Sequence, residues 1–492
     1  MKLSHTDSII NLNAPLAWTT ANPEEQKMLQ NLQGNILKSH GRKFTANIFF
    51  RLGEDIAQSR RLLRELANYH ISDAHRQLLD TEKFKQTGDG GGAFCHLALS
   101  YKGYAALDLL DAAPQDDDFV KGMQHADSIK ALHDPDLCCW ETEFQKEFHG
   151  LLLVADESEY DVLKLSRDVF VPLLEKSGCS IHIIQNGKAI HNQAGNGIEH
   201  FGYVDGRSQP LMLWEDINSE SMSSGISRWD PAFPLATALV EDPGVCDGLS
   251  FGSYFIFRKL EQNVQDFKRR EQEVADLLGF KDEERELAGA MLVGRFEDGT
   301  PATLSDEAKG QKPPNNFSYK GDDGTRCPFH AHIRKTNPRG TGGFEDEADE
   351  RLHLMARRGI PFEDIERRVH PDNLPESTSL AEFEHKVAPL LPTGGLGLLF
   401  MAYNNSIANQ FKFTQQNWAN NPDFPNQSQL ANLGIDPVIG QAGADQNLGA
   451  QQLPKKWDDP TSDKVSCSFV GFVTMKGGEY FFSPSLTFLK NL

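Results

Sequence analysis

The chain has 492 residues, of which 39% are hydrophobic and 24% charged, and its formal net charge is −21 at pH 7. This balance is typical of a globular protein with one or more sizeable cores, and the length allows about two to four domains. So acidic a surface repels phosphate backbones and anionic membranes, so we expect neither nucleic acid nor a membrane as partner. No apolar run reaches the roughly 18 residues that a membrane helix needs.

Cysteine usage points to the compartment. Seven cysteines are scattered along the chain, and none are spaced as Cys-x-x-Cys. An odd number at low density is typical of free thiols in a reducing environment, and the adjacent pair Cys138 and Cys139 is interpreted in the same way. The N-terminal segment has no continuous apolar stretch after a basic start and no twin arginine. The sequence therefore predicts a cytoplasmic protein.

The first 200 residues alternate between strand-like and helix-like patterns. Strands are predicted at 46–52, 94–99, 150–154 and 180–184. Helices are predicted at 54–69 and 159–174, where apolar residues recur every three or four positions. The order β-α-β-β-α-β is the split ferredoxin-like motif, which implies an antiparallel sheet with helices on one face.

The second half begins with the same kinds of element. A strand is predicted at 252–257, followed by a long helix that ends at Gly279. The apolar stripe of this helix consists of Leu260, Val264, Phe267, Val274, Leu277 and Leu278. Further strands are predicted at 396–403, 469–473 and 480–482, and polar surface loops at 298–324 and 414–452. We infer an α+β protein with two ferredoxin-like domains, 1–200 and 201–492.

Three segments contain residues that could carry chemistry, and the first is FGYVDGRSQP at 201–210. Asp205 precedes a glycine, and Asp-Gly is a common turn dipeptide. The alternative is a carboxylate that the glycine-permitted backbone fixes toward a pocket. The spacing alone does not decide between the two.

The second segment is TRCPFHAHIRKTNPR at 325–339, with His330 and His332 close together. A histidine in such a run is usually a hydrogen-bonded structural residue. If one imidazole binds metal, haem iron suits it, because haem needs only one protein ligand. The neighbouring cations, Arg334 among them, would then match the haem propionates.

The third segment is LMARRGIPF at 354–362. Its adjacent Arg357 and Arg358, followed by Gly-Ile-Pro, are interpreted most simply as a helix end with solvated charges. The alternative is one arginine buried beside a metal site.

Together and in this order, the three segments resemble the dye-decolorising peroxidase family. Further matching segments cover almost the whole chain: LQGNIL (32–37), GSYFIFRKL (252–260), LVGRFEDGTP (292–301), GLLFMAYNNS (397–406), GIDPVIGQ (434–441) and KGGEYFFSPS (476–485). The resemblance is strongest to the larger fungal and cyanobacterial-type members. It implies a pair of ferredoxin-like domains and one haem b per chain, with one iron, in the C-terminal domain.

The resemblance also assigns residues. His332 matches the proximal iron ligand, with His330 as its rival. Asp205 matches the distal acid, and Arg357 matches the distal arginine, with Arg358 as its rival. Leu398 and Phe400 match apolar residues on the distal haem face, and strand alternation places both on one side. Asp436 resembles the acid that hydrogen-bonds the proximal histidine in the larger members, whereas the stretch NNSIANQ, where many members carry that acid, has none.

The implied reaction is reduction of hydrogen peroxide coupled to oxidation of dyes and phenolic reductants. Since an aspartate has an ordinary pKa of about 3.9, an acidic activity optimum is expected. Large dyes imply oxidation partly at the surface through aromatic relays, for which Trp418 and Tyr403 are candidates, although both could be core aromatics. The alternatives are a haem- or iron-handling protein and a cofactor-free ferredoxin-like binding module, and a homo-oligomer is compatible with any of the three.

Overall fold

The computed structural model describes residues 9–310, 312–375, 377–425, 432–441 and 448–492. Ten of its strands form one antiparallel sheet, with the path β10-β11-β8-β14-β2-β3-β1-β4, to which β7 and β9 are added at β8 and β11. The strands of this sheet are β1 (Phe44–Arg51), β2 (Phe94–Leu99), β3 (Gly150–Asp156), β4 (Ser180–Lys188), β7 (Val240–Glu241), β8 (Phe251–Gln262), β9 (Ala356–Arg357), β10 (Ile360–Glu363), β11 (Leu396–Asn404) and β14 (Val473–Ser483). Two small ladders, β5 (Ile190–His191) with β6 (Gly197–Ile198) and β12 (Gln451–Pro454) with β13 (Lys464–Cys467), lie outside it.

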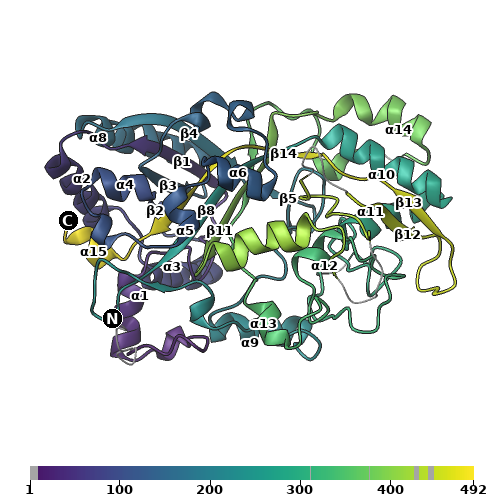
Figure 1. Cartoon of the computed structure of the whole chain (residues 1–492), viewed down its shortest axis with the longest axis horizontal. Helices are drawn as coiled ribbons and strands as arrows, with labels where there is room; N and C mark the ends of the chain where they lie inside the picture. Colours follow the sequence, from purple (N-terminus) through teal and green to yellow (C-terminus); the bar gives the residue numbers. More distant parts are fainter. Residues whose placement is uncertain (1–8, 311, 376, 426–431, 442–447) are drawn as a thin grey trace.

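Helices surround the sheet, and Figure 1 shows the N-terminal elements at one end of the molecule and α10, α11 and α14 at the other. The α-helices are α1 (Pro23–Asn31), α2 (Ile56–Tyr69), α3 (Ala74–Thr87), α4 (Tyr101–Ala106), α5 (Asp117–Lys121), α6 (Ala126–Leu132), α7 (Glu159–Leu165), α8 (Val171–Lys176), α9 (Trp214–Ser224), α10 (Val264–Leu278), α11 (Arg285–Val293), α12 (His332–Thr336), α13 (Glu347–Arg351), α14 (Leu380–Lys386) and α15 (Leu486–Lys490). None of the helices in the described ranges is long and apolar enough to span a membrane.

The sheet contains the ferredoxin-like order twice. In the sheet, the N-terminal strands lie side by side in the order β4-β1-β3-β2 and the C-terminal strands in the order β14-β8-β11-β10. When the four strands of each set are numbered by their place in the chain, both orders are 4-1-3-2. The α+β class with antiparallel pairing and flanking helices is therefore confirmed. The two sets are not separate sheets, however, because Phe482 of β14 pairs with Leu99 of β2. The boundary at residue 200 stays a prediction.

The two ends of the strand path approach each other closely. A Cβ atom on Gly187 of β4 would lie only 2.6 Å from Cγ2 of Ile360 in β10. Glycine permits this approach, because a larger residue would have to displace the side chains of Thr45 and Ile360. This approach curves the long sheet round its buried aromatic core.

The predicted N-terminal elements agree with the structure. In α2, Asp55 caps the first turn by accepting from the Gln58 backbone N–H, and Leu62, Leu63 and Leu66 form the buried stripe. The predicted helix 159–174 is one helix interrupted by a π-helical turn at Ser166–Phe170. Pro172 follows that turn, and its lack of an N–H explains why regular hydrogen bonding breaks there.

Several predictions for the second half need correction. Leu260 belongs to β8 rather than to the following helix, although α10 does end at Gly279 with a left-handed φ of +81°. In the predicted strand 469–473 only Val473 is in a strand, because Phe469 and Phe472 instead pack their rings against Phe267 of α10.

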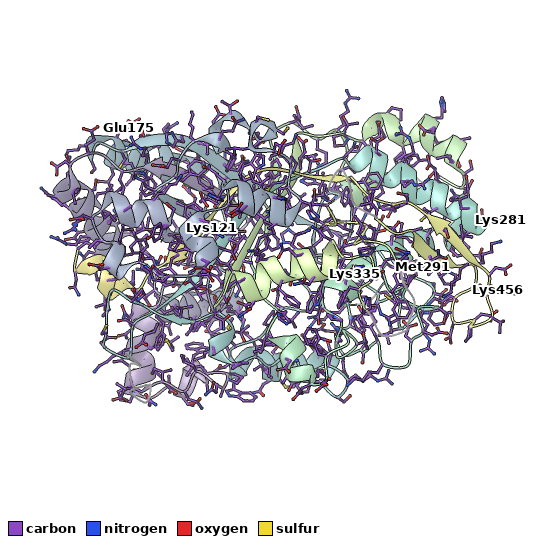
Figure 2. All side chains as sticks on the ribbon, in the orientation of Figure 1. Lys121, Glu175, Lys281, Met291, Lys335 and Lys456 are labelled. Atoms are coloured by element: carbon purple, nitrogen blue, oxygen red, sulfur yellow. The ribbon has the colours of Figure 1, made fainter. Side chains whose placement is uncertain are left out.

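The two predicted surface loops are also more ordered than expected. Residues 298–324, apart from 311, contain no helix or strand, but Phe317 and Tyr319 are buried. The described part of 414–452 includes the π-helical turn Thr414–Ala419 and the strand β12, while 426–431 and 442–447 lie outside the described residues. Side chains throughout fill the interior, where Met291 and Lys335 lie, whereas Lys281 and Lys456 are exposed (Figure 2).

Candidate active site

A cavity of about 670 Å³ lies among the three segments that the sequence singled out. Its wall includes Asp205, His332, Arg357, Leu398 and Phe400. Residues 37–39 of the N-terminal half also line it. The fold therefore gathers five of the seven predicted site residues round one space, although they are far apart in the sequence.

His332 is held by a buried carboxylate. It begins the short helix α12, and its Nδ1 lies 2.8 Å from Oδ2 of Asp436, whose side chain is fully buried. A carboxylate only accepts hydrogen bonds, so Nδ1 carries the proton and donates it. The other ring nitrogen, Nε2, then keeps a free lone pair for a ligand.

Asp436 is fixed by its own backbone turn. Its Oδ1 accepts from the backbone N–H groups of Val438 and Ile439 at 2.8 and 3.0 Å. Burial opposes ionisation, but the attraction of His332 and these hydrogen bonds together lower the pKa of Asp436. The structure thus brings the sixth predicted residue into contact with His332.

His330 occupies a different environment. Its side chain is buried, it does not line the main cavity, and it lies instead at a smaller cavity of about 340 Å³. Its Nε2 has no hydrogen-bond partner among the described residues. The geometry therefore favours His332 over His330 as the imidazole that faces the main cavity.

Asp205 combines both of its sequence interpretations. Its backbone N–H donates to the Gly197 carbonyl at 3.0 Å, and its Oδ1 accepts from the N–H of Gly206, which has a φ of +77°. The residue is thus part of a turn that needs glycine. The same turn leaves the carboxyl group exposed at the cavity wall.

Arg357 lies in β9 and Arg358 directly follows that strand, so neither is at a helix end, which corrects the simpler sequence interpretation. Arg357 pairs with Ala402 of β11, and the Arg358 backbone N–H donates to the Met401 carbonyl at 2.6 Å. The strand pattern was hidden because Gly359 and Pro361 follow immediately. Pro361 is tolerated because β10 lies at the end of the sheet path.

The two arginines differ in how their guanidinium groups are used. Arg357 donates from Nη2 to the Arg207 carbonyl at 3.0 Å and is half-buried at the cavity. Arg358 is buried and donates to the carbonyls of Asn35, Ile36 and Arg357 at 2.7–2.8 Å. Arg357 therefore keeps donors for a bound molecule, whereas those of Arg358 are engaged by the backbone.

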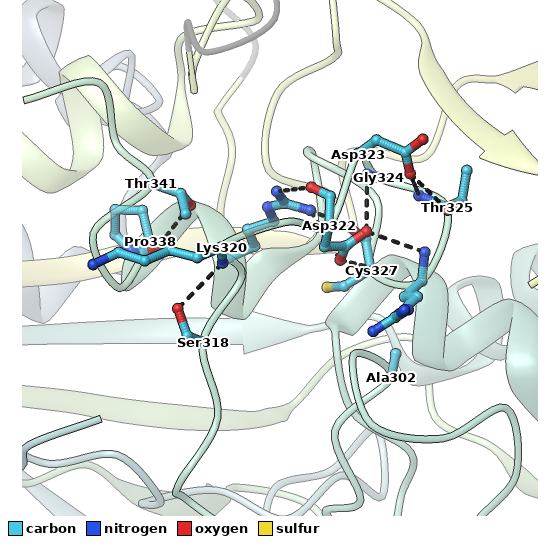
Figure 3. Close-up of polar contacts among 12 residues, drawn as sticks. Ala302, Ser318, Lys320, Asp322, Asp323, Gly324, Thr325, Cys327, Pro338 and Thr341 are labelled. Carbon is cyan, nitrogen blue, oxygen red and sulfur yellow. Dashed lines mark hydrogen bonds and ion pairs between the residues drawn. The ribbon is translucent and has the colours of Figure 1, made fainter. Parts of the chain in front are cut away.

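Arg334 does not reach the cavity, contrary to expectation. It is completely buried, its Nη1 lies 3.3 Å from Oδ2 of Asp322, and its guanidinium lies over the rings of Tyr319 and Phe329. Asp322 also accepts from the backbone N–H groups of Gly324 and Cys327 (Figure 3). Arg334 therefore stabilises the loop before α12, because its partners lie within the protein.

Other arginines supply positive charge at the cavity instead. Arg207, Arg295 and Arg339 all line it, and Arg295 and Arg339 both donate to Oγ of Ser208. Burial lowers the pKa of Arg295 to about 10 and that of Arg339 to about 9. Arg207 and Arg295 were missed, since no local sequence pattern shows that Arg295 meets Ser208, which is 87 residues away in the chain.

A second carboxyl group at the cavity was also missed. Glu199 accepts from the backbone N–H groups of Phe201 and Tyr203 at 2.8 and 3.0 Å, and burial raises its pKa to about 7. It shapes the loop that carries Asp205. The only sequence signal was its place six residues before that aspartate.

The apolar wall agrees with the strand alternation. Leu398 and Phe400 of β11 both line the cavity, whereas the intervening Leu399 is fully buried on the other face. Tyr403 and Trp418, candidates for a surface relay, are 0% and 1% exposed. Both are core aromatics, so neither side chain reaches the surface.

These residues can hold haem more readily than a bare metal ion. No cluster of three or more His, Cys, Asp or Glu side chains suited to a metal exists in the described ranges. One imidazole with a free Nε2 is enough for iron that a porphyrin already holds. The apolar wall suits the macrocycle and the buried arginines suit its carboxylates, so the residues present fit haem.

Known proteins share this arrangement of the chain. Residues 31–188 match the family model described as the DyP dimeric alpha+beta barrel domain. The chain is 43% identical to the multifunctional dye peroxidase of Amycolatopsis sp., over 98% of this chain and 100% of that protein. It is 30% identical to the dye-decolorizing peroxidase of Mycena epipterygia, over 93% and 86% of the two chains.

Solved structures agree with these relatives. The Amycolatopsis sp. enzyme superposes with a TM-score of 0.89 at 42% identity, covering 98% of this chain and 100% of that one. The DyP-type peroxidase of Anabaena sp. superposes with a TM-score of 0.85 at 36% identity, covering 99% of each chain. The similarity therefore covers both sets of strands in the sheet and the parts of the chain that line the cavity.

Proposed function

The chain belongs to the family of dye-decolorising peroxidases, and we propose that it binds one haem b through His332, reduces hydrogen peroxide, and oxidises dyes and phenolic compounds. One observation carries this proposal: Asp205, Arg357 and His332 line a single cavity, and His332 is held there by its hydrogen bond to Asp436. When bound, the haem would supply the redox chemistry for the reduction of peroxide and the oxidation of the reductants.

On the proximal side, the chain controls the ligand. Asp436 accepts a hydrogen bond from Nδ1–H of His332 and so fixes the tautomer and the ring orientation. This makes the imidazole a stronger electron donor than it would be alone. Arg295 and Arg339 would neutralise the haem carboxylates.

On the distal side, the chain handles protons and charge. Asp205 would accept the proton from one oxygen of peroxide and return it to the departing oxygen, which a positioned carboxylate can do within hydrogen-bond reach. Arg357 would stabilise the negative charge that develops during cleavage, because its guanidinium is held in place at the cavity wall. Neither group is needed for merely storing haem, which argues against a haem-handling role.

The remaining assignments extend this proposal. We propose that the chain is divided at residue 200 into an N-terminal and a C-terminal domain, that the protein is cytoplasmic, and that it can form a homo-oligomer. The seven cysteines are all free thiols in the structure, which supports a reducing compartment.

A matched pair of histidine variants tests the proposal. The purified protein should show a Soret band and should decolorise an anthraquinone dye when peroxide is added. His332→Ala should lose haem, whereas His330→Ala should retain it. Absence of a Soret band from the wild-type protein after haem loading, or loss of haem only in His330→Ala, would contradict the assignment.

A further inference from the structure

Lys335 is a buried lysine close to the proximal histidine, and the proposed mechanism does not use it. It lies three residues after His332 on α12, in the interior of the molecule (Figure 2), and is 0% exposed. Its Nζ donates to the backbone carbonyls of Asn421, Phe424 and Trp418 at 2.6, 2.8 and 3.3 Å. All three ammonium donors are therefore satisfied by one segment, 418–424.

That segment also contacts the turn that carries Asp436. The Ala419 carbonyl accepts from the Asp436 backbone N–H at 2.8 Å, and Oδ1 of Asn420 accepts from the Gln441 N–H at 2.8 Å. Segment 418–424 is thus held between Lys335 on one side and residues 436–441 on the other. A shift of the segment would move Asp436 relative to His332.

Charge supports the same arrangement. Burial lowers the pKa of Lys335 to about 7, and the attraction of Asp436 and Asp423 opposes this lowering. A buried ammonium is costly unless its donors are paired and a carboxylate lies near. The three hydrogen bonds to the backbone of segment 418–424 therefore hold the Lys335 side chain in this buried place.

We propose that Lys335 is a positioning residue for the proximal pair. By holding segment 418–424 on α12, it keeps the turn of Asp436, and with it that carboxylate, against Nδ1 of His332. The consequence for iron rests on the proposed function: a carboxylate at Nδ1 strengthens the imidazole as a donor and favours the ferric state. The contact between Asp436 and His332 does not depend on haem and can be measured without it.

The experiment uses the full chain with Lys335→Met, which removes the charge and the donors, and Lys335→Gln, which keeps two donors. Lys259→Met is the matched control, because Lys259 is also a buried lysine, but it binds Glu141 and Asp364 and does not line the cavity. In the apoprotein, NMR follows the His332 Nδ1–H proton. Its exchange with solvent should be at least about tenfold faster in Lys335→Met, intermediate in Lys335→Gln and unchanged in Lys259→Met.

The haem-loaded proteins give a second measurement. The Fe(III)/Fe(II) midpoint potential should rise by about 59 mV or more in Lys335→Met, a tenfold change in the one-electron equilibrium. Wild-type exchange and potential in a folded Lys335 variant, or equal effects in Lys259→Met, would overturn the proposal. If Lys335→Met does not fold, Lys335→Gln decides. A wild-type protein that binds no haem would contradict the proposed function. The exchange rates of the His332 Nδ1–H proton in the apoprotein would still test the positioning role of Lys335.

Discussion

The two sides of the cavity differ in how far the protein satisfies its own polar groups. On the proximal side, Asp436 is fully buried and its two oxygens bind His332, Val438 and Ile439. On the distal side, Asp205 is exposed, and its carboxylate accepts from Gly206 in its own turn. The proposed ligand side is therefore assembled in advance, whereas the proposed peroxide side keeps hydrogen-bonding capacity free for a bound molecule.

The largest expected effect comes from the exposed acid. Asp205→Asn should lower kcat/KM for peroxide by about 10²–10⁴-fold, because the amide cannot accept and return the proton. Stopped-flow recording of the Soret band after peroxide addition measures this rate. Asp205→Glu should retain part of it, and a loss below about tenfold in the asparagine variant would remove Asp205 from the acid–base role.

The next effect concerns charge on the same side. Arg357→Leu should slow peroxide cleavage by about 10²–10³-fold while haem is retained, since a positioned cation is lost. Arg357→Lys keeps the charge and should be less impaired. The same stopped-flow assay applies, and a leucine variant as fast as the wild type would mean that the distal side works through Asp205 alone.

A smaller effect is expected on the proximal side. Asp436→Asn should weaken haem binding by about 10–100-fold, as measured by transfer of haem to an acceptor protein.

The pKa of Asp436 is lowered on folding, so its stabilising contribution is present above the ordinary pKa of about 3.9 and is lost as pH falls through the folded value.

This sign gives a pH test of the same variant. The wild-type protein should exceed Asp436→Asn in free energy of unfolding at about pH 7, and the difference should shrink below about pH 3.9. Urea unfolding at several pH values measures it. A difference that grows on acidification would show that Asp436 is protonated in the folded protein.

Much of the fold followed from local patterns, because periodicity reports which residues face a core. Leu62, Leu63 and Leu66 recur at helical spacing and form the buried stripe of α2. By contrast, β9 and β10 were missed because Arg357 and Arg358 are charged and Pro361 is atypical of strands. Periodicity fails where strands are two to four residues long.

The site was predictable only through resemblance. His332 and Asp436 are 104 residues apart, so no spacing rule could pair them. Arg334 was expected at the cofactor because it is a cation near His332, but Asp322 binds it within a loop. The sequence shows that a positively charged residue lies near His332 in the chain. It does not show which way that side chain points, because this depends on partners from other parts of the fold.

The pairing of β14 with β2 bears on how this protein could be dissected. The last strand pairs with the N-terminal set at Phe482 and Leu99, and α15 packs on α2 near the chain's end. A fragment ending at residue 200 would expose the edge of β2 and the surface of α2 that contacts α15, and exposed strand edges promote aggregation. The two halves should therefore be produced together, and we expect them to unfold in one cooperative transition rather than as two independent modules.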